Sequence, residues 1–102
     1  MRANELLERI KARSAPVIVD ARTGIEFRRG HVPGAIHAPF WMTPLSAARL
    51  PKDKDLELVI YCGHGPRAWI AQKALAARGY GHIGLLEGHM KGWREAGLPL
   101  EK

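Results

Sequence analysis

Residues 56–75 read LELVIYCGHGPRAWIAQKAL, which is the pattern of a strand, a tight glycine-containing loop and a helix. The apolar run at 58–61 is typical of a strand that is buried on both faces of a sheet. A proline suits the first turn of a helix, and here it opens an alanine-rich stretch that predicts a helix over 66–78, ended by Gly79. Cys62, the only cysteine of the chain, lies where the predicted strand meets the loop.

The same alternation of short apolar strands and helices continues on both sides of this stretch. Strands are predicted at 16–20, 35–38, 58–61 and 82–86, and helices at 4–13, 23–29, 43–49, 66–78 and 90–96. Asn4 is the predicted N-cap of the first helix, and Thr43 caps the helix that Pro44 begins. This order predicts an α/β fold with a parallel sheet covered on both faces. Ligands of such sheets bind beyond the carboxyl ends of the strands, where Asp20 and Cys62 are expected.

The composition indicates a single domain over residues 1–102. Hydrophobic residues make up 46% of the chain and charged residues 25%, which is ordinary for a globular protein with its own core. The single cysteine excludes an intramolecular disulfide. No apolar run approaches the length of a membrane span, and residues 1–10 lack the apolar core of a signal peptide. We therefore expect a cytoplasmic protein with no membrane association.

The net charge of +6 favours anionic partners. The basic residues are scattered along the chain, and Arg28-Arg29 is their only adjacent pair. Aromatic residues do not alternate with them as stacking platforms for bases do, so a nucleic-acid partner is not expected. A small anionic substrate and an acidic protein partner fit the charge equally well.

The loop after Cys62 has features that favour a thiolate, the form in which cysteine acts as a nucleophile. The amino terminus of a helix carries partial positive charge, and Gly63 and Gly65 allow successive N–H groups to turn inward as an anion nest. Arg67 adds a full positive charge. If Cys62 accepted a sulfur atom, the same groups would stabilise the persulfide anion. The alternative is a buried cysteine at a strand end that acts only as a small hydrophobic residue.

The length of this loop discriminates between two reactions. Four residues separate Cys62 from Arg67. The signature loop of cysteine-dependent phosphatases is one residue longer, because it encloses the oxygens of a phosphoryl group. The shorter loop suits a single sulfur atom better.

His64 either hydrogen-bonds an anionic leaving group or is a solvated loop residue. No second cysteine and no suitably spaced histidine completes a metal site, so neither a metal nor another cofactor is predicted.

Three groups of short motifs follow one another along the chain. They are VDAR at 19–22 with Glu26-Phe27 and GHVPGAIHAP at 30–39, then CGHGPR at 62–67, then Gly79-Tyr80, LEG at 86–88 and Trp93. Together they resemble the single-domain form of the rhodanese family, from Leu6 to Pro99. The resemblance implies a three-layer α/β/α sandwich around a central, mainly parallel sheet of four to five strands.

The resemblance also implies a thiosulfate-type sulfurtransferase. The residue matching Cys62 would take a sulfane sulfur from a small anionic donor, thiosulfate or a persulfide, and pass it to cyanide, a thiol or a protein. The residues that would bind the substrate and the persulfide are Gly63, His64, Gly65, Pro66 and Arg67. The alternative is a rhodanese-like module that binds a partner protein without catalysis. The presence of Cys62 together with Gly65 and Arg67 argues against that alternative.

Three further residues are expected at the rim of the site. Arg22 either attracts the anionic donor or forms a structural pair with Asp20, and the structural pair is favoured. Trp41 either docks a protein acceptor or caps the core, and Trp69 is expected to face a partner or the rim. Trp93 is expected in the core.

Two features depart from the family pattern. His89 stands where the family usually has a glycine, and a turn that needs a positive φ forms less easily with histidine. The chain also begins close to its first helix, so the short N-terminal strand of the family is expected to be absent or vestigial.

Overall fold

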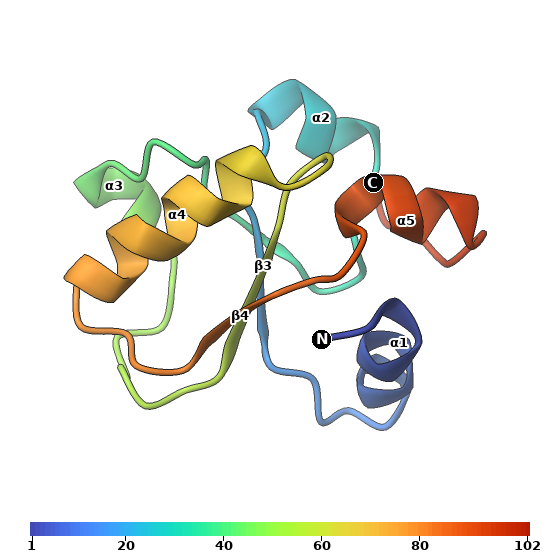
Figure 1. Cartoon of the computed structure of the whole chain (residues 1–102), viewed down its shortest axis with the longest axis horizontal. Helices are drawn as coiled ribbons and strands as arrows, with labels where there is room; N and C mark the ends of the chain where they lie inside the picture. The colour runs from blue at the N-terminus through green and yellow to red at the C-terminus, as the bar shows by residue number, and fades with distance from the viewer.

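The computed structural model describes residues 1–102 and places a four-stranded parallel sheet between helices (Figure 1). The strands are β1 (Val17–Asp20), β2 (Ile36–His37), β3 (Leu58–Tyr61) and β4 (Ile83–Leu85), in the spatial order β2-β1-β3-β4. The helices are α1 (Ala3–Lys11), α2 (Gly24–Arg29), α3 (Pro44–Ala47), α4 (Pro66–Ala77) and α5 (His89–Glu95). The predicted α/β fold with a parallel central sheet is confirmed.

One face of the sheet is covered by the layer that contains α3 and α4 (Figure 1). Side chains alternate between the faces along a strand, so Val19 of β1 and Ile60 of β3 share this face. They belong to the same buried cluster as Ala68, Ala71 and Leu75 of α4. The small alanine side chains allow the helix to approach the sheet closely.

The opposite face is covered by α1 and α5, which lie together on the other side of the sheet (Figure 1). Ile18 and Val59 point to this face and cluster with Leu6 of α1 and with Met90 and Trp93 of α5. Trp93 is fully buried, as predicted, and its indole N–H donates to the carbonyl of Pro99. Both faces of β1 and β3 are therefore buried, which explains why these strands read as continuous apolar runs.

The predicted helix boundaries are confirmed at some ends and wrong at others. Thr43 caps α3 by accepting a hydrogen bond from the Ser46 N–H, and Gly79 follows α4 with a φ of +98°. The prediction that Asn4 is an N-cap is wrong, because α1 begins at Ala3 and is preceded by Arg2, which forms no side-chain cap.

The start of the chain lies beside the edge strand β4. The Met1 amino group donates to the carbonyl of Leu85 at 2.8 Å, and the Met1 carbonyl accepts from the N–H of Glu87 at 2.9 Å. These bonds hold Met1 beside β4, and the N-cap of α1 is Arg2, two residues before the predicted Asn4. The sheet has no strand ahead of β1.

None of the helices has both the length and the apolar character that crossing a membrane requires.

Candidate active site

The carboxyl ends of β1 and β3 lie next to each other and carry the two loops that build the site. Asp20 is paired in register with Tyr61, so Cys62 follows β3 at the same edge where Asp20 ends β1. α2 continues from the first loop and α4 from the second. Parallel strands thus bring together the two segments that the sequence places about forty residues apart.

The loop after β3 folds back on the cysteine. The Cys62 Sγ accepts a hydrogen bond from the N–H of Gly65 at 3.0 Å. Gly65 has a φ of +137°, which favours glycine, and Pro66 then begins α4. The sequence predicts an anion nest of successive N–H groups around the sulfur, and the structure shows one of them, the Gly65 N–H, bonded to Sγ before α4 begins.

The base of this loop is anchored to the start of α5. The carbonyl of Cys62 accepts from the Met90 N–H at 2.9 Å, and the carbonyl of Gly63 accepts from the Lys91 N–H at 3.0 Å. The N–H of Cys62 donates to Nδ1 of His89 at 3.2 Å. His89 has a φ of +52°, so the turn forms with histidine in the left-handed region where glycine is favoured.

The thiol of Cys62 is fully buried. Its exposed fraction is 0%, and the residue belongs to the hydrophobic cluster that contains Ala68 and Ala71 of α4. In this conformation the sulfur is therefore closed off from solvent.

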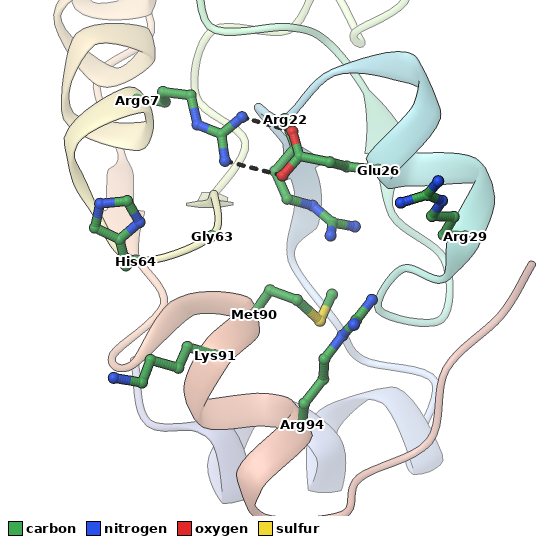
Figure 2. A pocket seen from close by; sticks show the side chains of 9 residues that line it. All are labelled: Arg22, Glu26, Arg29, Gly63, His64, Arg67, Met90, Lys91 and Arg94. Carbon is green, nitrogen blue, oxygen red and sulfur yellow. Dashed lines mark hydrogen bonds and ion pairs between the residues drawn. The ribbon is translucent and has the colours of Figure 1, made fainter.

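Arg67 lies across the loop from an acidic partner rather than free in solution. Its guanidinium donates two hydrogen bonds to the carboxylate of Glu26, at 2.6 and 3.0 Å (Figure 2). These bonds lower the pKa of Glu26 to about 2, and Glu26 in turn raises the pKa of Arg67, with smaller contributions from Cys62. Glu26 also accepts from the N–H of Thr23 in the capping box of α2. The pair ties the start of α4 to α2.

Arg22 is also paired with a carboxylate, that of Asp20, but this pair lies in the interior. It is 3% exposed, and its guanidinium donates to both carboxylate oxygens of Asp20 and to the carbonyl of Gly30. Burial opposes the charge of Arg22, but the hydrogen bonds and charge of Asp20 raise its pKa above the ordinary value. The Tyr61 hydroxyl donates to Asp20 at 2.7 Å and accepts from the Val32 N–H. Asp20 thus joins β1, β3 and the segment before β2.

A pocket of about 630 Å³ opens between α2, the cysteine loop and α5 (Figure 2). Nine residues line it: Arg22, Glu26, Arg29, Gly63, His64, Arg67, Met90, Lys91 and Arg94. Glu26 is the only acid among them, facing five cationic side chains. Arg29, Lys91 and Arg94 form no ion pair and no side-chain hydrogen bond. In Figure 2 the head groups of Arg29 and Arg94 point toward Arg22. The pocket is suited to an anion.

The family model described as the Rhodanese-like domain matches residues 2–96. The chain belongs to this family. A sulfurtransferase from Allochromatium vinosum is 34% identical over 98 residues, covering 96% of this chain and 90% of the relative. The thiosulfate sulfurtransferase GlpE from Shewanella oneidensis is 33% identical over 95 residues, covering 91% and 89% of the two chains. A rhodanese-related protein from Thermoplasma volcanium has a crystal structure that matches with a TM-score of 0.80 at 28% identity, covering 99% of this chain and 95% of that one.

The predicted loop residues of this rhodanese domain lie around the pocket. Gly63, His64 and Arg67 line it, and Gly65 and Pro66 form the turn into α4. Arg22 also lines it and forms the structural pair with Asp20. No group of three His, Cys, Asp or Glu side chains converges as metal ligands would.

The two tryptophans predicted near the rim lie outside the pocket. Trp41 is 54% exposed and Trp69 is 55% exposed. Trp69 lines a separate hollow along α4, where the ammonium of Lys73 lies 5.1 Å from the centre of its ring. Both rings are available to solvent, which is compatible with the partner-facing role that the sequence suggests for Trp69.

Sequence reasoning missed four features of the rhodanese site. It did not pair Glu26 with Arg67, and it did not bring Arg29, Lys91 and Arg94 to the pocket. The spacing of Lys91 and Arg94 within α5 places them on one helix face, which is a usable signal. Nothing in the local sequence indicates that this face meets the Cys62 loop.

Proposed function

We propose that this rhodanese domain is a sulfurtransferase that carries a sulfane sulfur on Cys62. The donor is a small anion such as thiosulfate or a persulfide, and the acceptor is cyanide, a thiol or a protein thiol. The single observation that carries the proposal is the hydrogen bond from the Gly65 N–H to the Cys62 Sγ, at the start of α4. Such donors stabilise a sulfur anion at the end of a helix, both as a thiolate and as a persulfide. We place the reaction in a reducing compartment such as the cytoplasm, because the one cysteine must stay free.

In the first half-reaction the Cys62 thiolate attacks the outer sulfur of thiosulfate. The new bond joins Sγ to that sulfur, the old sulfur–sulfur bond breaks, and sulfite leaves with the bonding electron pair. In the second half-reaction a thiolate or cyanide attacks the terminal sulfur of the Cys62 persulfide. The bond to Sγ breaks, and Cys62 returns as a thiolate, which gives ping-pong kinetics.

The cationic residues of the pocket differ in how strongly they attract an anionic donor. Arg29, Lys91 and Arg94 carry charge that no acid neutralises, so they attract the anionic donor toward Gly63. Arg67 is bound to Glu26, so its charge acts on the site only in part. Because Cys62 is fully buried, transfer includes a step that exposes Sγ to the pocket through rotation about its χ1 bond or movement of the loop.

Intact-protein mass spectrometry tests this proposal directly. After incubation with thiosulfate, the wild-type protein gains the mass of one sulfur atom, with release of one equivalent of sulfite. Cys62→Ser gains no mass and releases no sulfite. If wild-type protein gains no sulfur from thiosulfate or from any persulfide donor, the proposed function is wrong.

The full burial of Cys62 favours a second candidate, a rhodanese-like module that binds a partner without catalysis. In that case the thiol is part of the core, and the wild-type mass stays unchanged with every donor. The mass measurement therefore separates the two candidates.

A further inference from the structure

His89 lies beneath the cysteine loop at the first position of α5. Its Nδ1 accepts a hydrogen bond from the Cys62 N–H. No other side chain forms a hydrogen bond with the backbone of Cys62 or Gly63. Its Nε2 lies 3.5 Å from the point where a Cβ on Gly65 would be. The imidazole ring is therefore bonded to the first residue of the turn around the Cys62 sulfur and lies on the side of Gly65 where a Cβ would project.

The hydrogen bond determines the protonation state of the ring. An Nδ1 that accepts carries no proton, so the ring is neutral with its proton on Nε2. An imidazolium has N–H donors on both nitrogens and cannot accept from the Cys62 N–H. Burial lowers the pKa of His89, and the nearby His64 lowers it further, which is consistent with a neutral ring at pH 7.

The backbone at His89 supports a role for this ring. Its φ of +52° lies in the region where a side chain is disfavoured and glycine is not. Glycine at this position would relieve that cost but would leave the Cys62 N–H without its partner. The strained backbone of His89 is therefore found at a residue whose imidazole holds the cysteine loop through the Cys62 N–H.

We propose that His89 is a positioning residue for sulfur transfer, which holds the Cys62 peptide through Nδ1 and so orients the thiol toward the Gly65 N–H. This inference rests on the proposed function for its kinetic consequence, but the hydrogen bond itself can be tested without any sulfur donor. As the pH falls through the pKa of His89, which burial lowers, the ring gains a proton and the bond to Cys62 is lost.

Other groups that titrate or carry charge lie near His89 across the loop or along the chain. The N–H of Cys62 bonds the ring, His64 of the cysteine loop lowers its pKa, and Glu87 and Lys91 stand two residues to either side of it in the sequence. His64 lies close enough to lower the pKa of His89, so it needs its own control.

Two substitutions separate the ring's hydrogen bond from its backbone conformation. His89→Asn retains an acceptor near the position of Nδ1, tolerates the positive φ and does not titrate. His89→Gly accepts the same φ but has no acceptor. We expect His89→Asn to form the Cys62 persulfide within about twofold of the wild-type rate, and His89→Gly to be about tenfold slower, the order of magnitude of one lost hydrogen bond.

The pH profile supplies a readout that a merely structural role does not change. Protonation of His89 contributes to the fall of the wild-type rate at acid pH, and this contribution is absent from His89→Asn. His64→Asn retains this contribution, and His82→Asn, which changes an exposed histidine outside the pocket, leaves the profile unchanged. If the asparagine and glycine variants are equally slow, or if both match the wild type, the proposed role is wrong.

Nuclear magnetic resonance of the imidazole nitrogens tests the hydrogen bond without a sulfur donor. We expect an unprotonated Nδ1 at pH 7 and a Cys62 amide resonance that shifts as His89 titrates. Hydrogen exchange of the Cys62 amide is faster in His89→Gly than in His89→Asn. A proton on Nδ1 at pH 7 would overturn the inference even if the protein transfers sulfur. If no variant accepts sulfur but these spectra are as expected, the proposed function fails and the contact stands.

Discussion

The loops after β1 and β3 end at the same edge of the sheet, and each contains an arginine paired with a carboxylate. Arg22 and Asp20 are 3% and 0% exposed, and their network extends to Tyr61 and Gly30. Arg67 and Glu26 are 25% and 35% exposed and lie at the mouth of the pocket. The Asp20–Arg22 pair is shielded from water and forms a fixed frame for the strand ends, whereas water can compete for the hydrogen bonds of the Arg67–Glu26 pair. The buried pair therefore fixes the strand ends, whereas the part-buried pair joins α2 to the start of α4 at the pocket.

The largest effect is expected from breaking the buried pair. Asp20→Asn leaves the Arg22 charge uncompensated and removes the carboxylate that Tyr61 bonds. We expect the free energy of unfolding, measured by urea denaturation, to fall by about 3–5 kcal/mol. Tyr61→Phe, which removes one hydroxyl from the same network, is expected to lose about 1–3 kcal/mol. An Asp20→Asn loss below that of Tyr61→Phe would show that the first loop is not the fixed frame.

A smaller effect is expected from stiffening the cysteine loop. Gly65→Ala places a Cβ at a φ of +137°, in contact with the His89 ring. We expect a loss of about 1–3 kcal/mol in stability and slower persulfide formation. Gly81→Ala is the matched control, because Gly81 has no positive φ and open space around its Cβ position. Equal stability of the two alanine variants would contradict the strained turn.

The unpaired cations are expected to affect binding more than stability. Arg94→Gln should raise the KM for thiosulfate roughly two- to fivefold at low salt, with kcat nearly unchanged, because it removes one exposed charge. The difference from wild type should shrink as salt screens the pocket. Lys11→Gln, at the end of α1 and outside the pocket, should leave KM unchanged. A KM effect that does not depend on salt would argue against electrostatic attraction.

The smallest effect is expected from the part-buried pair of Arg67 and Glu26. The pKa of Glu26 is lowered from 4.5 to about 2, so its contribution to stability is present above pH 4.5 and is lost as the pH falls toward 2. Glu26→Gln removes this contribution and should flatten the loss of stability over that range. At pH 7 the cost should be within about 1 kcal/mol, because solvent screens the pair. An equally steep acid transition in both proteins would contradict the low pKa.

The segments that the sequence predicted best are those that carry their own boundary signals. α4 lies between Pro66 and Gly79, and β3 is an apolar run, so both were predicted to within a residue. The predicted start of α1 is less accurate, because no side chain caps this helix. The chain before it is held instead by the bonds between Met1 and the β4 segment. Long-range backbone pairing of this kind leaves no mark on the local sequence.

Local sequence is enough to specify the order of the strands and helices, the position of Cys62 at a strand end and the turn residues Gly65 and Pro66. These depend on hydrophobic pattern and on backbone preferences, which act over a few residues. Three other features of the site come from the folded chain: Glu26 pairs with Arg67, α5 brings Lys91 and Arg94 to the pocket, and His89 holds the Cys62 peptide. These contacts join segments far apart in the chain, and they depend on how the sheet's register and the packing of α2 and α5 bring those segments to one edge.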